Sequence, residues 1–116
     1  MPIVTLYSSA TLPADMSEAL LLRLSSAVST ELSKPEGYVM ARLALDAPMA
    51  FAGSLDPSCL VEIKSIGGLT PQSTKRLSEV VCTIVQDALG IPKTRTYVVC
   101  TDVAAFLWGL NGSTFG

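Results

Sequence analysis

The first half of the chain changes from a strand-like to a helix-like pattern of apolar residues and back again. Residues Ile3 to Tyr7 are rich in β-branched side chains, which predicts a short strand. A helix-spaced stripe follows, made of Leu20, Leu24, Val28 and Leu32. Asp15 and Glu18 have the spacing of a capping box, and Pro35 disfavours a helical residue before it. We therefore expect a helix that starts near Asp15 and ends before Pro35, and then a strand over Tyr38 to Leu45.

The second half repeats this order after a turn-rich segment. Residues 46–57 hold the turn-forming residues Pro48, Gly53, Asp56 and Pro57, and Cys59 to Ile66 then predicts a strand. Thr70 precedes a proline, as an N-cap often does, and Gly90 suits the end of a helix. Between them lies a stripe at helical spacing: Leu77, Val80, Val81, Ile84, Val85, Ala88 and Leu89. Thr96 to Thr101 predicts the last strand.

The order β-α-β, link, β-α-β predicts an α/β (α+β) fold in one domain over residues 1–116, with pseudo-repeats at about 2–46 and 59–101. If both crossovers are right-handed, the strands form one four-stranded mixed sheet with both helices on one face. The other face then has no cover within the chain, and we expect few polar residues on it. Such a face needs a partner.

The composition favours an oligomer. The chain is 49% hydrophobic, which is more apolar matter than a single 116-residue domain buries well. No apolar run approaches the ~20 residues of a membrane span. The net charge is −2 and no basic cluster is present, so we expect neither a nucleic-acid nor a membrane partner. The first residues do not resemble a secretory signal, which predicts a cytoplasmic protein and leaves secretion by another route open.

The chain has no histidine, and this narrows the chemistry. Catalytic pairs that need histidine are excluded, and the three cysteines, Cys59, Cys82 and Cys100, have no metal-site or disulfide-framework spacing. We therefore expect no metal and no cofactor. Acid–base work at neutral pH would have to come from a carboxylate, Lys, Tyr, Cys or the terminal amine.

Pro2 would carry that terminal amine once Met1 is removed, which a small second residue permits. The new terminus would be a secondary amine at the head of a strand. Apolar surroundings disfavour its charged form and lower its pKa, so that the neutral amine could take a proton from carbon next to a carbonyl. The alternative interpretation is an ordinary second residue.

Several segments, in the right order, give the chain its likeness to a known family. These segments are Met1-Pro2-Ile3-Val4, Lys34-Pro35-Glu36-Gly37-Tyr38-Val39, Pro48-Met49-Ala50-Phe51-Ala52-Gly53, Ser65-Ile66-Gly67-Gly68, Ile91-Pro92 with Arg95-Thr96-Tyr97, and Asn111-Gly112-Ser113-Thr114-Phe115. With them the chain resembles the macrophage migration inhibitory factor family of the tautomerase superfamily over nearly its whole length.

The resemblance implies a homotrimer with three active sites at subunit boundaries. It implies keto–enol tautomerisation of phenylpyruvate-like 2-keto acids, with Pro2 as the base. Lys34 and the backbone amide of Ile66 would hold the substrate carboxylate, and Tyr97 of a neighbouring subunit would help to bind or protonate the substrate. Without the resemblance, Lys34 reads as a solvated cation, Tyr97 as core packing and the glycines after Ile66 as a turn.

Two other functions stay open beside the tautomerase. One is a cytokine-like signalling ligand with a vestigial site. Members with that activity commonly carry an asparagine where Val99 stands, some use a C-x-x-C that is lacking at Cys59, and the arginine of the receptor-binding motif has no counterpart. The other is a related reaction such as dehalogenation or decarboxylation, for which Arg42 and Arg95 are the candidate extra cations.

Overall fold

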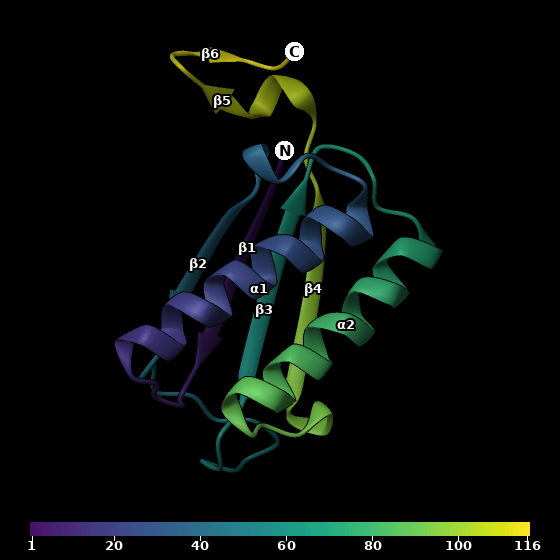
Figure 1. The fold of residues 1–116 in the computed structure, drawn as a ribbon. Coiled ribbons are helices and arrows are strands. Elements are labelled where there is room, and N and C mark those ends of the chain that lie inside the picture. Colours follow the sequence, from purple (N-terminus) through teal and green to yellow (C-terminus); the bar gives the residue numbers. More distant parts are fainter.

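A four-stranded mixed sheet organises the molecule, as seen in a computed structural model that describes residues 1–116 (Figure 1). The strands are β1 (Pro2–Ser8), β2 (Met40–Ala44), β3 (Cys59–Ser65) and β4 (Thr96–Asp102), in the spatial order β2-β1-β3-β4. Each pair joined by a helix is parallel, and the central pair β1–β3 is antiparallel. The predicted fold class is confirmed. The division into pseudo-repeats within one domain stays a prediction.

Two helices, α1 (Ala14–Leu32) and α2 (Pro71–Leu89), cover the same face of the sheet (Figure 1). The predicted stripe of α1 is buried as expected, at Leu20, Leu24, Val28 and Leu32. It packs on inward-facing strand residues such as Val4, Leu6, Val61 and Ile63, all fully buried. Neither helix is long and apolar enough to cross a bilayer.

The two helices begin in different ways. Thr70 is the N-cap of α2, where its hydroxyl accepts from the Ser73 amide at 3.0 Å and the Ser73 hydroxyl accepts from the Thr70 amide at 2.8 Å. The capping box predicted for α1 at Asp15 and Glu18 is wrong. Pro13 occupies the N-cap position without a side-chain cap bond, and Asp15 already lies in the first turn. There its carboxylate can act only on the positive end of the helix dipole.

The helix ends follow the predicted signals. Gly90 closes α2 in the left-handed conformation, and Ser33 closes α1 in the same way with φ 52°. A short 3₁₀ turn, η1 (Glu36–Tyr38), follows α1, so β2 begins two residues later than predicted. Another 3₁₀ turn, η2 (Lys93–Arg95), leads into β4.

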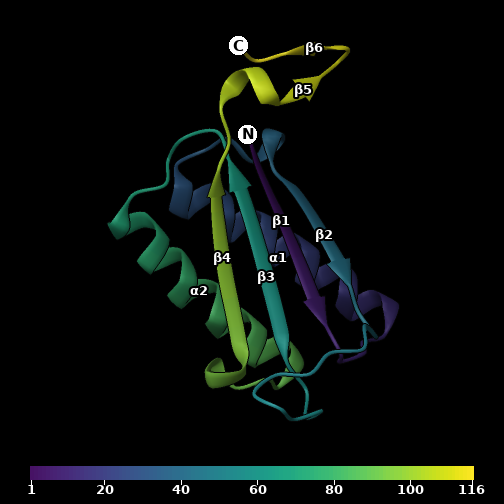
Figure 2. The same cartoon turned by 180° about the vertical axis from the view of Figure 1, so that it is seen from behind.

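Figure 2 shows the face of the sheet that neither helix covers. This face is more polar than the sequence pattern suggested. Pairing places Thr5 opposite both Arg42 and Glu62, and these residues with Lys64 line a hollow of about 310 Å³. The expectation of few polar residues on this face is therefore wrong. It rested on the overall hydrophobic composition of the strands, which does not show which residues point to which face. Towards the β2 and β4 edges this face exposes apolar side chains, of which Met40 and Tyr97 are more than half exposed.

The last residues form a hairpin that the sequence analysis did not predict. After η3 (Ala105–Leu107), β5 (Gly109–Leu110) pairs with β6 (Ser113–Thr114). The turn between them has Asn111 at φ 54° and Gly112 at φ 76°, which is the left-handed pair of a type I′ turn. The hairpin stands beyond the end of the sheet where β1 begins, so both chain termini lie at that end (Figure 1).

Candidate active site

Pro2 lies at the head of β1 with its side chain fully buried. β1 runs between β2 and β3, and register places Pro2 opposite Ser65 at the end of β3. The residue therefore cannot move as a loose terminus would. Beside it is a hollow of about 340 Å³ that Met1, Pro2 and Ile3 help to line. A proline nitrogen freed at this position would face a confined and mainly apolar space.

The wall of this hollow comes largely from segments that the sequence analysis did not assign to the site. The η1 turn supplies Tyr38, and the C-terminal hairpin supplies Trp108, Leu110 and Phe115. The signal that could have found the hairpin residues is the Asn111-Gly112 pair, because Asn-Gly between apolar residues is a strong hairpin marker. The turn folds the apolar C-terminal segment back, so that it lies next to the N-terminal residues.

Lys34 is turned towards Pro2's end of the sheet by the way α1 ends. The Lys34 amide donates to the Ser29 carbonyl at 3.0 Å, and the Ser29 hydroxyl donates to the Lys34 carbonyl at 2.6 Å. The Lys34 ammonium then donates to the carbonyl of Ile66 at 3.0 Å. It therefore lies over the chain after β3 and is not a freely solvated cation.

Gly68 makes room for the Lys34 side chain. Its φ is +81°, and a Cβ atom there would meet Cε of Lys34 at 3.3 Å and the Leu32 carbonyl oxygen at 3.4 Å. A residue with a side chain would be strained by that backbone conformation and would also press on Lys34. Gly68 therefore allows both the turn after β3 and the close approach of the Lys34 side chain.

The Ile66 amide was expected to be free, but it donates to the carbonyl of Met1 at 3.2 Å. The neighbouring groups are held separately, since the Gly67 amide donates to a carboxylate oxygen of Asp102 at 3.1 Å and the Ser65 hydroxyl to the Gly67 carbonyl at 2.7 Å. The Met1 carbonyl thus occupies the one acceptor position at this amide. Removal of Met1 would vacate it.

The electrostatics at the start of the chain favour a neutral amine. Burial first, and then the positive charge of Lys34, lower the pKa of the Met1 amine below its ordinary value. Pro2 lies further inside than Met1, and its side chain is fully buried. The same two causes would therefore act on a Pro2 amine. A lowered pKa places more of it in the neutral, proton-accepting form at pH 7.

Tyr97 lies away from Pro2 within one chain. It pairs with Leu60 at the start of β3, whereas Pro2 pairs with Ser65 at the end of that strand. Five residues of extended chain, at about 3.3 Å each, separate the two positions by roughly 16 Å. Tyr97 is also 62% exposed, so it is not the core residue of the alternative interpretation. Pro2, Lys34 and Ile66 are brought together, and Tyr97 is not.

The remaining candidates for chemistry lie outside this hollow. Arg42 is on the uncovered sheet face, and the guanidinium of Arg95 is bonded to backbone carbonyls of the loop before β3. Burial raises the pKa of Cys59 to about 12, with a smaller contribution from Cys82, and burial also raises that of Cys100. These thiols are poor nucleophiles at neutral pH.

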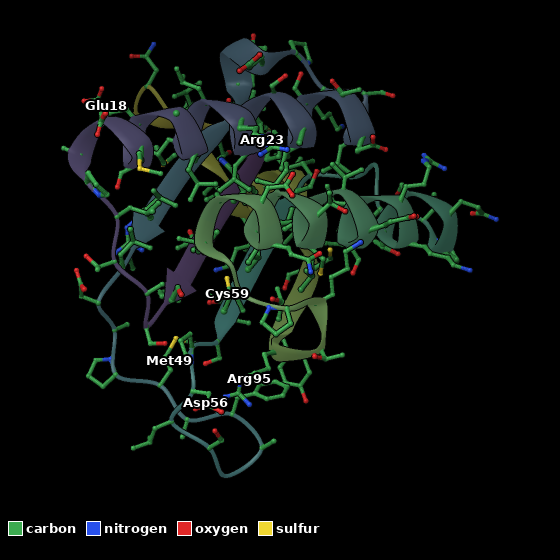
Figure 3. All side chains as sticks on the ribbon, turned by 60° about the horizontal axis from the view of Figure 1, so that its bottom comes forward. Glu18, Arg23, Met49, Asp56, Cys59 and Arg95 are labelled. Carbon is green, nitrogen blue, oxygen red and sulfur yellow. The ribbon has the colours of Figure 1, made fainter.

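A larger hollow, about 470 Å³, lies between the two helices on the covered side of the sheet. Its one arginine, Arg23, is labelled in Figure 3 and forms an ion pair with Asp87 at 3.0 Å. No group of three His, Cys, Asp or Glu side chains is placed to hold a metal ion. The hollow at Pro2 is therefore the better candidate for chemistry.

The fold and this site define a class: a two-layer α/β protein of two β-α-β units whose second residue, a proline, sits beside a mainly apolar hollow and close to a lysine. Residues 1–116 match the family described as Macrophage migration inhibitory factor (MIF), and the chain belongs to that family. A Macrophage migration inhibitory factor homolog of Wuchereria bancrofti is 37% identical over 117 residues, covering 100% of both chains.

Solved structures agree with this assignment. The chain is similar to the crystal structure of a macrophage migration inhibitory factor homologue from Prochlorococcus marinus, with 46% identity and a TM-score of 0.93, covering 98% of this chain and 99% of the other. It is also similar to the structure of the Macrophage Migration Inhibitory Factor from Trichinella spiralis, with 32% identity and a TM-score of 0.88, covering 97% and 99%. The predicted family is confirmed.

Proposed function

We propose that the protein is a keto–enol tautomerase for phenylpyruvate-like 2-keto acids, with the Pro2 nitrogen as general base after Met1 is removed. The observation that carries this proposal is the placement of Pro2. It is fully buried at the head of a central strand, next to a mainly apolar hollow of about 340 Å³ and close to Lys34. A neutral secondary amine in that position is a base without a competing water shell.

The substrate fits the groups around the hollow. A 2-keto acid has a carboxylate, and the Lys34 ammonium with the vacated Ile66 amide would bind it by charge-assisted hydrogen bonds. An aryl group would contact the aromatic wall made by Tyr38, Trp108 and Phe115. This orientation places the carbon next to the ketone near the Pro2 nitrogen.

The reaction moves one proton and needs no cofactor. The Pro2 nitrogen takes a proton from the carbon adjacent to the ketone, the carbon–carbon double bond of the enol forms, and the ketone oxygen gains a proton from water. The protonated Pro2 nitrogen then gives its proton back to water, so that overall one proton has moved from carbon to oxygen. The positive charge of Lys34 stabilises negative charge that develops on the substrate. In the reverse direction the protonated Pro2 nitrogen returns the proton to carbon.

We further propose that the active unit is a homotrimer with sites at subunit boundaries. Two features support association. Apolar side chains are exposed on η3 and the hairpin, with Phe106, Leu107 and Leu110 each more than half exposed, and on the uncovered sheet face near Tyr97. Within one chain Tyr97 is also roughly 16 Å from Pro2 along the strands, so only a second copy can bring it to the hollow. Sedimentation velocity should show a trimer, and a folded monomer would contradict this proposal.

The Pro2→Ala variant tests the base. Alanine still permits removal of Met1, but it supplies a primary amine that is less basic and can rotate. We expect the rate of phenylpyruvate tautomerisation to fall by a factor of about 10² or more, which is the range of general base catalysis. The matched control is Pro13→Ala, at an exposed proline just before α1, which should keep the parent rate.

Intact mass must confirm that Met1 is absent from the parent and both variants. Equal turnover by Pro2→Ala and the parent would overturn the mechanism. A Met1-free parent that turns over no 2-keto acid would overturn the enzymatic proposal and favour the signalling alternative.

A further inference from the structure

The loop between β2 and β3, residues 45–58, has almost no regular structure of its own. Its one internal bridge joins Phe51 and Ser54, whose amides and carbonyls exchange hydrogen bonds at 3.0 and 2.9 Å. Ala52 and Gly53 lie between them with φ of 53° and 71°. Alanine in the left-handed region is strained, so another part of the molecule must hold this turn in place.

Arg95 holds the second half of this loop. The two ends of the loop are bonded elsewhere: the amides of residues 46 and 47 donate to carbonyls at the end of β1 and just after it, and the Ser8 hydroxyl donates to the Ser58 carbonyl. Its Nε donates to the Pro57 carbonyl at 3.0 Å and its Nη2 to the Asp56 carbonyl at 2.9 Å. Longer bonds reach the carbonyls of Phe51, at 3.3 Å, and Ser54, at 3.4 Å. Figure 3 shows Arg95 pointing into the loop beside Asp56. One side chain therefore satisfies four carbonyls of a segment that has few partners within itself.

Only arginine suits this arrangement. The acceptors lie on different parts of the loop and bond to three different nitrogen atoms of the guanidinium, whose donors form a rigid planar fork. A lysine has one nitrogen and cannot span them. The ion pairs of the protein involve other arginines, Arg23 and Arg76, so the Arg95 guanidinium is occupied by the loop backbone and not by a carboxylate.

The loop in turn contacts Tyr97. The Arg95 guanidinium carbon lies 5.2 Å from the centre of the Phe51 ring, and that ring packs edge-on against Tyr97 with centres 4.9 Å apart and planes at 63°. Such aromatic pairs have a preferred geometry and stabilise it. The Tyr97 ring is thus supported on one side although the residue is 62% exposed.

We propose that Arg95 is a positioning residue: it fixes the β2–β3 loop so that Phe51 holds the Tyr97 ring in the orientation that a neighbouring subunit's site requires. This inference rests on the proposed function, in which Tyr97 completes the site of another copy. Arg95 itself touches no substrate. It also leaves the dehalogenase interpretation without one of its two candidate cations, because the guanidinium is already bonded to the loop.

The variants Arg95→Lys and Phe51→Leu test this chain of contacts by kinetics. For Arg95→Lys we expect KM for phenylpyruvate to rise about five- to ten-fold while kcat changes less than two-fold, because the base and its hollow are untouched. Phe51→Leu should raise KM in the same way. Phe51→Tyr, which keeps the aromatic ring, should have the KM of the parent protein. The double variant Arg95→Lys/Phe51→Leu should be no worse than the poorer single variant, because both act through one path.

A second measurement reports on Tyr97 without activity. In protein labelled with 3-fluorotyrosine, the ¹⁹F resonance of Tyr97, assigned by its absence in Tyr97→Phe, should move and broaden in Arg95→Lys. The resonances of Tyr7 and Tyr38 should not. The control Arg23→Lys makes the same exchange at the exposed pair with Asp87 and should change neither KM nor the spectrum.

The outcomes separate the two proposals. If Pro2→Ala abolishes turnover but Arg95→Lys matches Arg23→Lys in KM and in the Tyr97 resonance, the positioning role is wrong and the tautomerase stands. If the parent has no turnover, the proposed function fails, and a Tyr97 resonance that moves in Arg95→Lys still supports the contact path. An unchanged resonance overturns the positioning role in either case.

Discussion

The two ends of the sheet are built in opposite ways, although the same four strands run through both. At the end where β1 begins, one buried residue, Pro2, is surrounded by a glycine turn, Lys34 and the C-terminal hairpin. At the other end, the ring of Tyr97 is exposed and packs against Phe51 of a loop that Arg95 binds. The groups at the first end can be preorganised within one chain, because all of them come from that chain and lie close together. The second end leaves an aromatic ring exposed, as the proposed contact with a neighbouring subunit requires.

This difference predicts that the two ends work together only between subunits. Pro2→Ala weakens and loosens the base of its own site, and Tyr97→Ala removes the tyrosine that is offered to a neighbour. If the two variants are denatured, mixed and refolded, hybrid trimers contain sites with both an intact Pro2 and an intact Tyr97. We expect kcat/KM of the mixture to exceed the sum of the two separate variants several-fold.

The control for this mixing experiment is each variant refolded with itself, which should gain nothing. Native mass spectrometry must show that hybrids form. Hybrid trimers without recovered activity would contradict the shared site and would confine the function to one end of the sheet.

The Lys34→Met variant sharpens the comparison at the Pro2 end. Because Lys34 lowers the pKa of the terminal amine, its removal raises that pKa. The base works when deprotonated, so the rising limb of kcat/KM against pH should move to higher pH. Loss of the carboxylate partner should also raise KM about ten-fold or more.

A pH–rate profile with phenylpyruvate checks both effects of Lys34→Met. Lys93→Met, at an exposed lysine in η2, is the matched control and should move neither. A limb that stays in place would show that Lys34 does not act on the amine.

The smallest expected effect concerns how the helices start at the two ends. Thr70→Ala at the Pro2 end removes a capping box and should lower the free energy of unfolding by about 1 kcal/mol. Asp15→Ala at the Tyr97 end removes no cap bond and should lower it by only a few tenths, through the dipole. Urea denaturation of both variants measures the difference. Equal losses would mean that Asp15 caps α1 in solution.

The sequence predicted those parts of the molecule that depend on local pattern. The stripe of α1, the Thr70 cap and the Gly90 end appear as expected, because helical spacing and termini are local signals. The Asp15 cap failed because Pro13 fixes the chain entry one residue before the helix. The polar row around Thr5 was missed because strand composition does not show which face each residue takes until register is known.

The site was predicted in the same uneven way. Pro2, Lys34 and Ile66 are close together as the family resemblance implied. The aromatic wall from Tyr38 and the hairpin depends on contacts between the two ends of the chain, which no local pattern encodes. The path from Arg95 to Tyr97 was missed for a related reason. The Arg95 guanidinium binds backbone carbonyls, which every residue has, so the side chains of its partners give no sequence signal for the contact.

The hydrogen bond between the Met1 carbonyl and the Ile66 amide has a practical consequence for anyone who prepares this protein. Under the proposed mechanism, an affinity tag ahead of Pro2 would leave its nitrogen in a peptide bond and keep a carbonyl bonded to the Ile66 amide, so tagged material would be inactive. A tag after Gly116 would project from beside Phe115, which lines the same hollow. Active preparations should come from chains with native ends, or with a C-terminal tag that has been cleaved off.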